Sequence, residues 1–190
     1  SGTWSLIGTE ITQPILNDNA RKLHFSTEGG IDYRFRFLKN YMGMWLFQNI
    51  RRNLNKSMTY DEMMKLAKNC GEYKYFDVND KTLVAPKNMI EAIGKLICSD
   101  DLGFILNSAY HSLAKSYDEA IKEIENVTGK QFNTIHIVGG GCQDEYLNAL
   151  TRDYTGKDVT AGPIEATATG NIFSQIISDK KISLAAARKI

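Results

Sequence analysis

Residues 134–143 read TIHIVGGGCQ, a short apolar run followed by three consecutive glycines. The pattern from Glu145 onward is helical, so the segment predicts a strand, a glycine turn and the start of a helix. Glycines adopt positive φ and lack the Cβ that would hold a ligand away, and the N–H groups of a helix start attract phosphate. The spacing matches neither G-x-G-x-x-G nor the P-loop pattern, and a tight turn is the commoner meaning of GGG alone.

The composition is that of an ordinary globular protein. The chain has 190 residues, of which 43% are hydrophobic and 24% charged, enough for one domain with a buried core. Its net charge of +1 gives no sign of a nucleic-acid partner, and no apolar run is long enough to span a membrane. The three cysteines, Cys70, Cys98 and Cys142, are odd in number and widely separated. They favour reduced thiols in a cytoplasmic protein and disfavour a zinc site or a disulfide framework.

The beginning of the chain suggests a piece of something larger. The sequence opens with Ser1 instead of Met, and a strand-like pattern starts at once. We therefore expect the chain to be cut from a longer polypeptide. Residues 1–30 alternate as short strands with turns between them and predict an antiparallel meander.

Residues 33–54 carry apolar side chains three and four positions apart and predict one helix. Two polar amides, Asn40 and Gln48, interrupt its apolar face. They would lie roughly 12 Å apart along the axis at 1.5 Å per residue, close to the length of a triphosphate. The two amides could therefore serve opposite ends of one ligand, or both could be surface side chains without a ligand.

The middle of the chain predicts helices with recognisable ends. A capping box at 59–62 starts a helix that Gly71 ends, and a second helix starts at Asn88. The longest helix covers 101–126, where apolar residues step by three and four without a break, and it ends at Gly129.

The last part of the chain predicts a helix after the glycine turn, a short strand at 158–161 and a final helix. Small residues in that final helix, Gly170 among them, would let two backbones approach closely. Strands first, then alternating helices and strands joined by glycine turns, predict an α/β or α+β layered domain.

Several motifs, in order along the chain, together resemble the rhamnulokinase group of the FGGY carbohydrate kinases. These motifs are SGTWSLIG at 1–8, EGG at 28–30, RFLKNYMGMWLFQ at 36–48, IHIVGGGCQ at 135–143 and AGPIEATATGN at 161–171. The resemblance implies an α/β fold of the ribonuclease H-like (actin-like ATPase) type, with a mixed sheet flanked by helices. It also implies that residues 1–190 are a C-terminal, nucleotide-binding domain without the N-terminal half that binds the sugar and holds the catalytic groups.

The resemblance assigns the chain's opening residues to the phosphates. In this family the Ser-Gly-Thr loop binds the terminal phosphates of ATP, which implies that role for Gly2 and Thr3. The Asn of the LKN motif, Asn40, is implied to bind the sugar. The Gln that ends the same motif, Gln48, is implied to bind the nucleotide.

The glycine run is implied to be the adenosine motif. Gly140 is the best single match, with Gly139 and Gly141 beside it. The partners implied are ATP or ADP, carried with Mg²⁺, and the sugar L-rhamnulose.

The resemblance implies transfer of the γ-phosphate of ATP to the C1 hydroxyl of L-rhamnulose, giving L-rhamnulose 1-phosphate in L-rhamnose catabolism. The family's catalytic Asp, a general base, would lie upstream of Gly2. No acid of this chain matches the position of that Asp. Asp32, Asp77, Asp80 and Glu165 are the candidates, and none of them fits. We therefore expect the fragment alone to be inactive. Two alternatives stay open: another FGGY kinase, acting on fuculose, xylulose or glycerol, and a non-catalytic nucleotide- or protein-binding module on the same fold.

Overall fold

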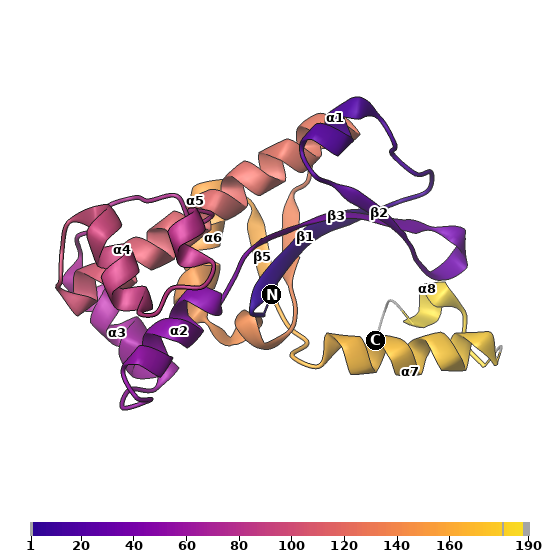
Figure 1. Ribbon diagram of the computed structural model, residues 1–190. Helices are drawn as coiled ribbons and strands as arrows, with labels where there is room; N and C mark the ends of the chain where they lie inside the picture. Colours follow the sequence, from indigo (N-terminus) through magenta and orange to yellow (C-terminus); the bar gives the residue numbers. More distant parts are fainter. Residues whose placement is uncertain (1, 180, 188–190) are drawn as a thin grey trace.

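The computed structural model describes residues 2–179 and 181–187. Ser1 of the first motif, Lys180 and the last three residues lie outside the described residues. The helices and strands are arranged as Figure 1 shows. In chain order they are β1 Trp4–Ile11, α1 Asp18–Lys22, β2 Ser26–Gly29, η1 Ile31–Tyr33, β3 Phe35–Met42, α2 Trp45–Asn53, α3 Tyr60–Cys70, η2 Lys81–Leu83, α4 Met89–Ile97, α5 Leu102–Thr128, β4 Thr134–Ile137, η3 Gly140–Gln143, α6 Glu145–Thr155, β5 Asp158–Ala161, α7 Ala166–Ser178 and α8 Leu184–Ala187.

The first sheet has three antiparallel strands in the order β1-β3-β2. Strand β1 pairs with β3 from Trp4 opposite Met42 to Ile11 opposite Phe35. The antiparallel strands expected in residues 1–30 are therefore present, but their common partner comes from the next segment of the chain. The short helix α1, between β1 and β2, was not predicted, because only a turn signal was visible there.

The helix expected over residues 33–54 is wrong, because its first half is strand β3 and only its second half is helix α2. Apolar residues four apart share a face in a strand as well as in a helix, and here the buried Phe37 and Tyr41 alternate with the exposed Arg36 and Asn40. A strand buries one side of that alternation on the long helix α5. Gly43 then separates the strand from the helix.

The second sheet pairs β4 and β5 in parallel, from Thr134 opposite Asp158 to Ile137 opposite Ala161. Helix α6 connects the two strands, which is the crossover that a parallel pair requires. Both strands lie where the sequence predicted them. Within the described residues the five strands form two sheets instead of one mixed sheet, and helices flank them (Figure 1). The predicted α/β class is confirmed.

Helix α5 is the centre of the core, as its unbroken apolar stripe predicted. The buried residues that step by three and four along its 27 residues are Leu106, Ala109, Leu113, Tyr117, Ala120 and Ile124. Gly129 ends the helix with φ 67°, in the left-handed region that glycine adopts readily. Helices α2, α3, α4 and α6 pack around one end of α5, and the three-stranded sheet packs along its other end (Figure 1).

The predicted helix ends are also confirmed. Thr59 and Glu62 form a complete capping box at the start of α3, and Gly71 ends that helix in the left-handed region. The Asn88 side chain accepts hydrogen bonds from two N–H groups at the start of α4. These local signals fix the ends of α3 and α4 independently of the packing around them.

Helix α7 differs from its prediction. None of its residues is buried, and a Cβ built on Gly170 would meet nothing within 4 Å, so its small residues bring no second backbone close among the described residues. In Figure 1 it lies with α8 apart from the helices around α5. Within residues 2–179 and 181–187, no helix is both long enough and apolar enough to cross a membrane.

Candidate functional site

A cavity of about 510 Å³ opens between the start of the chain, helices α2 and α3, and the glycine turn that follows β4. Four of the predicted site residues, Gly2, Gln48, Gly140 and Gly141, line it together. The other lining residues are Met44, Tyr60, Asp61, Met64, Gln143 and Asp144. The volume lies within the range of small-molecule sites. Segments from both ends of the sequence therefore meet at one place.

Backbone hydrogen bonds join the start of the chain to helix α2. The N–H of Met44 donates to the Gly2 carbonyl over 2.8 Å, and the N–H of Trp45 donates to the Thr3 carbonyl over 3.1 Å. Gly43 permits this close approach, since a Cβ there would lie 2.7 Å from the Gly2 oxygen. The first donors of α2 are satisfied in this way, and Gly2 and Thr3 are placed one helical turn from Gln48.

A side-chain hydrogen bond orients the Gln48 amide. Thr3 Oγ1 donates to Gln48 Oε1 over 3.1 Å. No described residue accepts a hydrogen bond from Gln48 Nε2, so the amide has its N–H donors left for a ligand in the cavity. Thr3 itself does not line the cavity but acts on it through Gln48.

The glycine turn presents backbone to the same cavity. Gly139 has φ 81°, a value that favours glycine, and its N–H donates to the Pro163 carbonyl over 3.1 Å. A Cβ built on Gly140 would meet no atom within 4 Å, so the cavity is open at this residue. Among the described residues no group accepts a hydrogen bond from the Gly140 N–H, which leaves a donor for an anion or a base.

The start of α6 is not available to phosphate in the way the sequence suggested. Asp144 caps this helix by accepting from the Leu147 N–H over 3.0 Å, and its other carboxylate oxygen accepts from the Tyr110 hydroxyl over 2.7 Å. Burial raises the pKa of Asp144 above its ordinary value, although these hydrogen bonds oppose that shift. A carboxylate therefore already occupies the positive end of α6, and the donors for a ligand come from the glycine turn before it.

Asn40 lies elsewhere. It is exposed on β3, opposite Leu6 of β1, and it does not line the cavity. The argument that placed Asn40 and Gln48 along one helix is therefore wrong, because the two amides belong to a strand and a separate helix. Its assignment to the sugar stays a prediction from the resemblance.

The wall that α3 contributes was missed by sequence reasoning. Tyr60, Asp61 and Met64 all line the cavity, and they lie in the first turns of the helix that the capping box starts. The capping signal reports a helix end and says nothing about what that end faces. Only the packing of α3 against α5 brings its first turn to the glycine turn.

None of the four acids considered as substitute bases lines the cavity. Two of them stabilise turns, since Asp77 accepts from the Asn79 N–H and Asp80 from the Thr82 N–H. Over the described part of the chain, no three His, Cys, Asp or Glu side chains form a group that could hold a metal ion.

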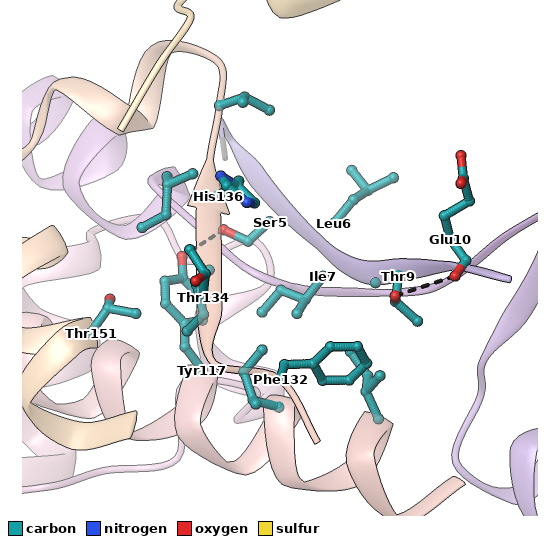
Figure 2. A pocket seen from close by; sticks show the side chains of 16 residues that line it. Ser5, Leu6, Ile7, Thr9, Glu10, Tyr117, Phe132, Thr134, His136 and Thr151 are labelled. Carbon is teal, nitrogen blue, oxygen red and sulfur yellow. Dashed lines mark hydrogen bonds between the residues drawn. The ribbon is translucent and has the colours of Figure 1, made fainter. Parts of the chain in front are cut away.

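A second cavity of about 500 Å³ lies between strands β1 and β4. Figure 2 shows that the two strands diverge there, with the Ser5 and Tyr117 hydroxyls 2.5 Å apart on its floor. Its walls are mainly apolar, and it contains none of the predicted site residues. It lies between the two sheets, and its lining includes Glu10 and His136.

Comparison with known proteins gives one family and a consistent set of relatives. Residues 1–178 match the C-terminal domain of the FGGY family of carbohydrate kinases. Proteins named rhamnulokinase from Halalkalibacterium halodurans and Bacillus subtilis are 42% and 40% identical, over 100% and 96% of this chain. The chain spans only 42% and 39% of the length of these two curated relatives.

A solved structure supports the fold. The crystal structure of xylulose kinase from Bifidobacterium adolescentis superimposes with a TM-score of 0.56 over 84% of this chain and 32% of that chain. The sequence identity is 18%, so this likeness shows the fold alone.

Proposed function

The chain belongs to the FGGY family of carbohydrate kinases, and on that premise we propose that residues 1–190 form the nucleotide-binding half of an ATP-dependent sugar kinase. The single observation that supports this most directly is the cavity lined together by Gly2, Gln48 and Gly140. These residues were predicted separately from different motifs. The N-terminal half, with the sugar-binding and catalytic groups, would belong to the longer polypeptide.

The proposed substrate is L-rhamnulose, phosphorylated at its C1 hydroxyl to L-rhamnulose 1-phosphate in L-rhamnose catabolism. The names of the relatives with 40–42% identity support this choice over fuculose or xylulose. We propose that Asn40 contacts the sugar. This residue is exposed on β3 and lies opposite Leu6 of β1.

The proposed mechanism is in-line transfer of the γ-phosphoryl group. Phosphoryl transfer depends on positioning and charge neutralisation more than on covalent help from the protein. The N–H donors of Gly140 and Gln48 would hold the nucleotide, Gly2 and Thr3 would lie beside its terminal phosphates, and Mg²⁺ would neutralise charge as part of the MgATP substrate. The general base would be an Asp of the N-terminal half, so this chain alone would transfer no phosphate.

The test uses Gly140→Val in the full-length protein, with Gly29→Val as the matched control. Both glycines have room for a side chain, but only Gly140 lines the cavity. We expect Gly140→Val to weaken MgATP binding in isothermal titration by at least about tenfold, and to leave the KM for L-rhamnulose within about twofold. An unchanged nucleotide affinity would rule out the cavity as the ATP site.

A panel of ketoses separates the alternatives. Phosphorylation of fuculose or xylulose in preference to L-rhamnulose by the full-length protein would identify another FGGY kinase. ADP binding without activity on any sugar would identify a non-catalytic nucleotide-binding module.

A further inference from the structure

The cavity has two chemically different sides. Gly2 and Gln48 offer backbone and amide polar groups. The first turns of α3 offer the aromatic ring of Tyr60 and the thioether of Met64 instead. A nucleotide is divided in the same way, into charged phosphates and a flat, uncharged base.

The Tyr60 ring is held in place by its neighbours without any ligand. The guanidinium carbon of Arg51 lies 5.1 Å from the ring centroid, and Arg51 Nε donates to the Met58 carbonyl over 2.8 Å. The capping box fixes the backbone next to Tyr60, with the Thr59 N–H donating to Glu62 over 2.7 Å. A ring fixed in this way loses little freedom when a flat group stacks on it.

Tyr60 keeps enough exposed surface to take a partner, since 44% of the residue is accessible. Arg51 lies over the ring, and Tyr60 also lines the cavity. Cation–π contact with the guanidinium and stacking of a base are compatible when they take opposite faces of one aromatic ring.

The side chains and backbone groups of the two sides favour one orientation of the ligand. Asp61, beside Tyr60, carries a carboxylate that pairs with Lys65 over 2.6 Å at the surface. Both lining carboxylates are already engaged, Asp61 by Lys65 and Asp144 by Tyr110 and the Leu147 N–H. The orientation rests instead on the polar groups of Gly2 and Gln48 and on the aromatic residue at α3. The phosphates would therefore point to Gly2, and the base to α3.

We propose that Tyr60 forms the stacking wall for the nucleobase of the bound nucleotide. This inference rests on the proposed nucleotide-binding function and adds a residue outside the motifs that indicated it. Stacking on an aromatic ring is available to every base, so the wall contributes affinity and does not by itself select ATP over GTP.

The test compares Tyr60→Ala, Tyr60→Leu and Tyr60→Phe with Tyr33→Ala in the full-length protein. Tyr33 is the matched control because it is 97% exposed and does not line the cavity. Isothermal titration measures the affinity for MgATP. Competition against MgATP measures the affinity for inorganic tripolyphosphate with Mg²⁺, which has phosphates but no base. Circular dichroism verifies that each variant is folded.

We expect Tyr60→Ala to weaken MgATP binding about tenfold while the affinity for tripolyphosphate stays unchanged. Tyr60→Leu should lose most of the same affinity, since it keeps apolar bulk but no ring, and Tyr60→Phe should retain it. Equal losses for MgATP and tripolyphosphate, or MgATP binding in Tyr60→Ala as tight as in Tyr33→Ala, would overturn the proposal. If Gly140→Val weakens MgATP binding and the Tyr60 variants do not, only this inference fails; if the unaltered protein binds no nucleotide, the proposed function fails first.

Discussion

The Thr3 hydroxyl donates a hydrogen bond of 3.1 Å to the Gln48 amide oxygen and joins the start of the chain to helix α2. Because the amide oxygen is engaged, the amide nitrogen is the group that Gln48 has left for the cavity. The pair converts a flexible side chain into a donor with a defined direction. The predictions below begin with this contact.

Gln48→Glu should weaken MgATP binding by roughly tenfold, because a negative oxygen replaces the donor that we propose to face the phosphates. The loss should shrink as salt is added. The matched control is Gln131→Glu, which adds the same charge at an exposed loop position. Titrations at low and high ionic strength provide the measurement, and a salt-independent loss would contradict the electrostatic explanation.

Gly43→Ala should lower the free energy of unfolding by about 1–3 kcal/mol, the usual cost of overpacking. Its Cβ would lie 2.7 Å from the Gly2 oxygen and 2.8 Å from the Thr3 oxygen, so the start of the chain must move. Nucleotide affinity should fall as well, since Thr3 then loses its position beside Gln48. Urea denaturation and nucleotide titration of the variant test both effects, with Gly29→Ala as the control. A Gly43→Ala variant with native stability would show that the start of the chain can move without loss of unfolding free energy.

Acidification should destabilise the fold through His111. This ring stacks on Tyr73 with centroids 3.6 Å apart, and its Nδ1 lies 2.7 Å from the Tyr154 hydroxyl. Burial lowers the pKa of His111 below its ordinary value of about 6.5. Between the lowered pKa and about 6.5 the unfolded chain binds more protons than the folded one, so stability falls as pH falls through that window.

His111→Gln isolates this effect, because the glutamine does not titrate. The difference in unfolding free energy between the unaltered protein and His111→Gln should shrink as pH falls from 7.5 toward 5.5. The raised pKa of Asp144 acts in both proteins and cancels in the difference. Parallel stability curves over this range would exclude a contribution from His111.

Lys157→Met should destabilise the fold by about 2–3 kcal/mol, as expected when one partner of a largely buried ion pair is removed. Lys157 Nζ donates to Glu125 and to the Phe132 carbonyl, each over 2.7 Å, and the two charged side chains are 15% and 12% exposed. Adding Glu125→Gln should restore part of the loss, because no unpaired carboxylate is then left. A double-mutant cycle by urea denaturation measures the coupling, and strictly additive losses would mean that the pair is not coupled.

Local signals predicted most of the fold correctly. The stripe of α5 and the caps at Thr59, Asn88 and Gly129 depend on neighbours within a few residues, so the sequence contains them in full. Strand β3 was missed because apolar residues four apart share a face in both a helix and a strand, and pairing with β1 and β2 decides in favour of the strand.

The site was predictable only in part. Motif resemblance selected Gly2, Gln48 and Gly140, which the structure brings to one cavity. The spacing argument for Asn40 failed with the helix on which it rested. Tyr60 carried no signal beyond its place after Thr59, because its position in the cavity depends on how α3 packs against α5.

The walls of the cavity come from segments that meet only when the chain is folded, from Gly2 at one end to Asp144 near the other. A bound nucleotide would therefore contact distant parts of the sequence at once. The unfolded chain has no such site, so the nucleotide would bind and stabilise only the folded state. Each tenfold excess of nucleotide over its Kd would then add about 1.4 kcal/mol of resistance to heat and proteases. A simple melting assay against a library of nucleotides could accordingly rank ligands for this domain before any sugar is found.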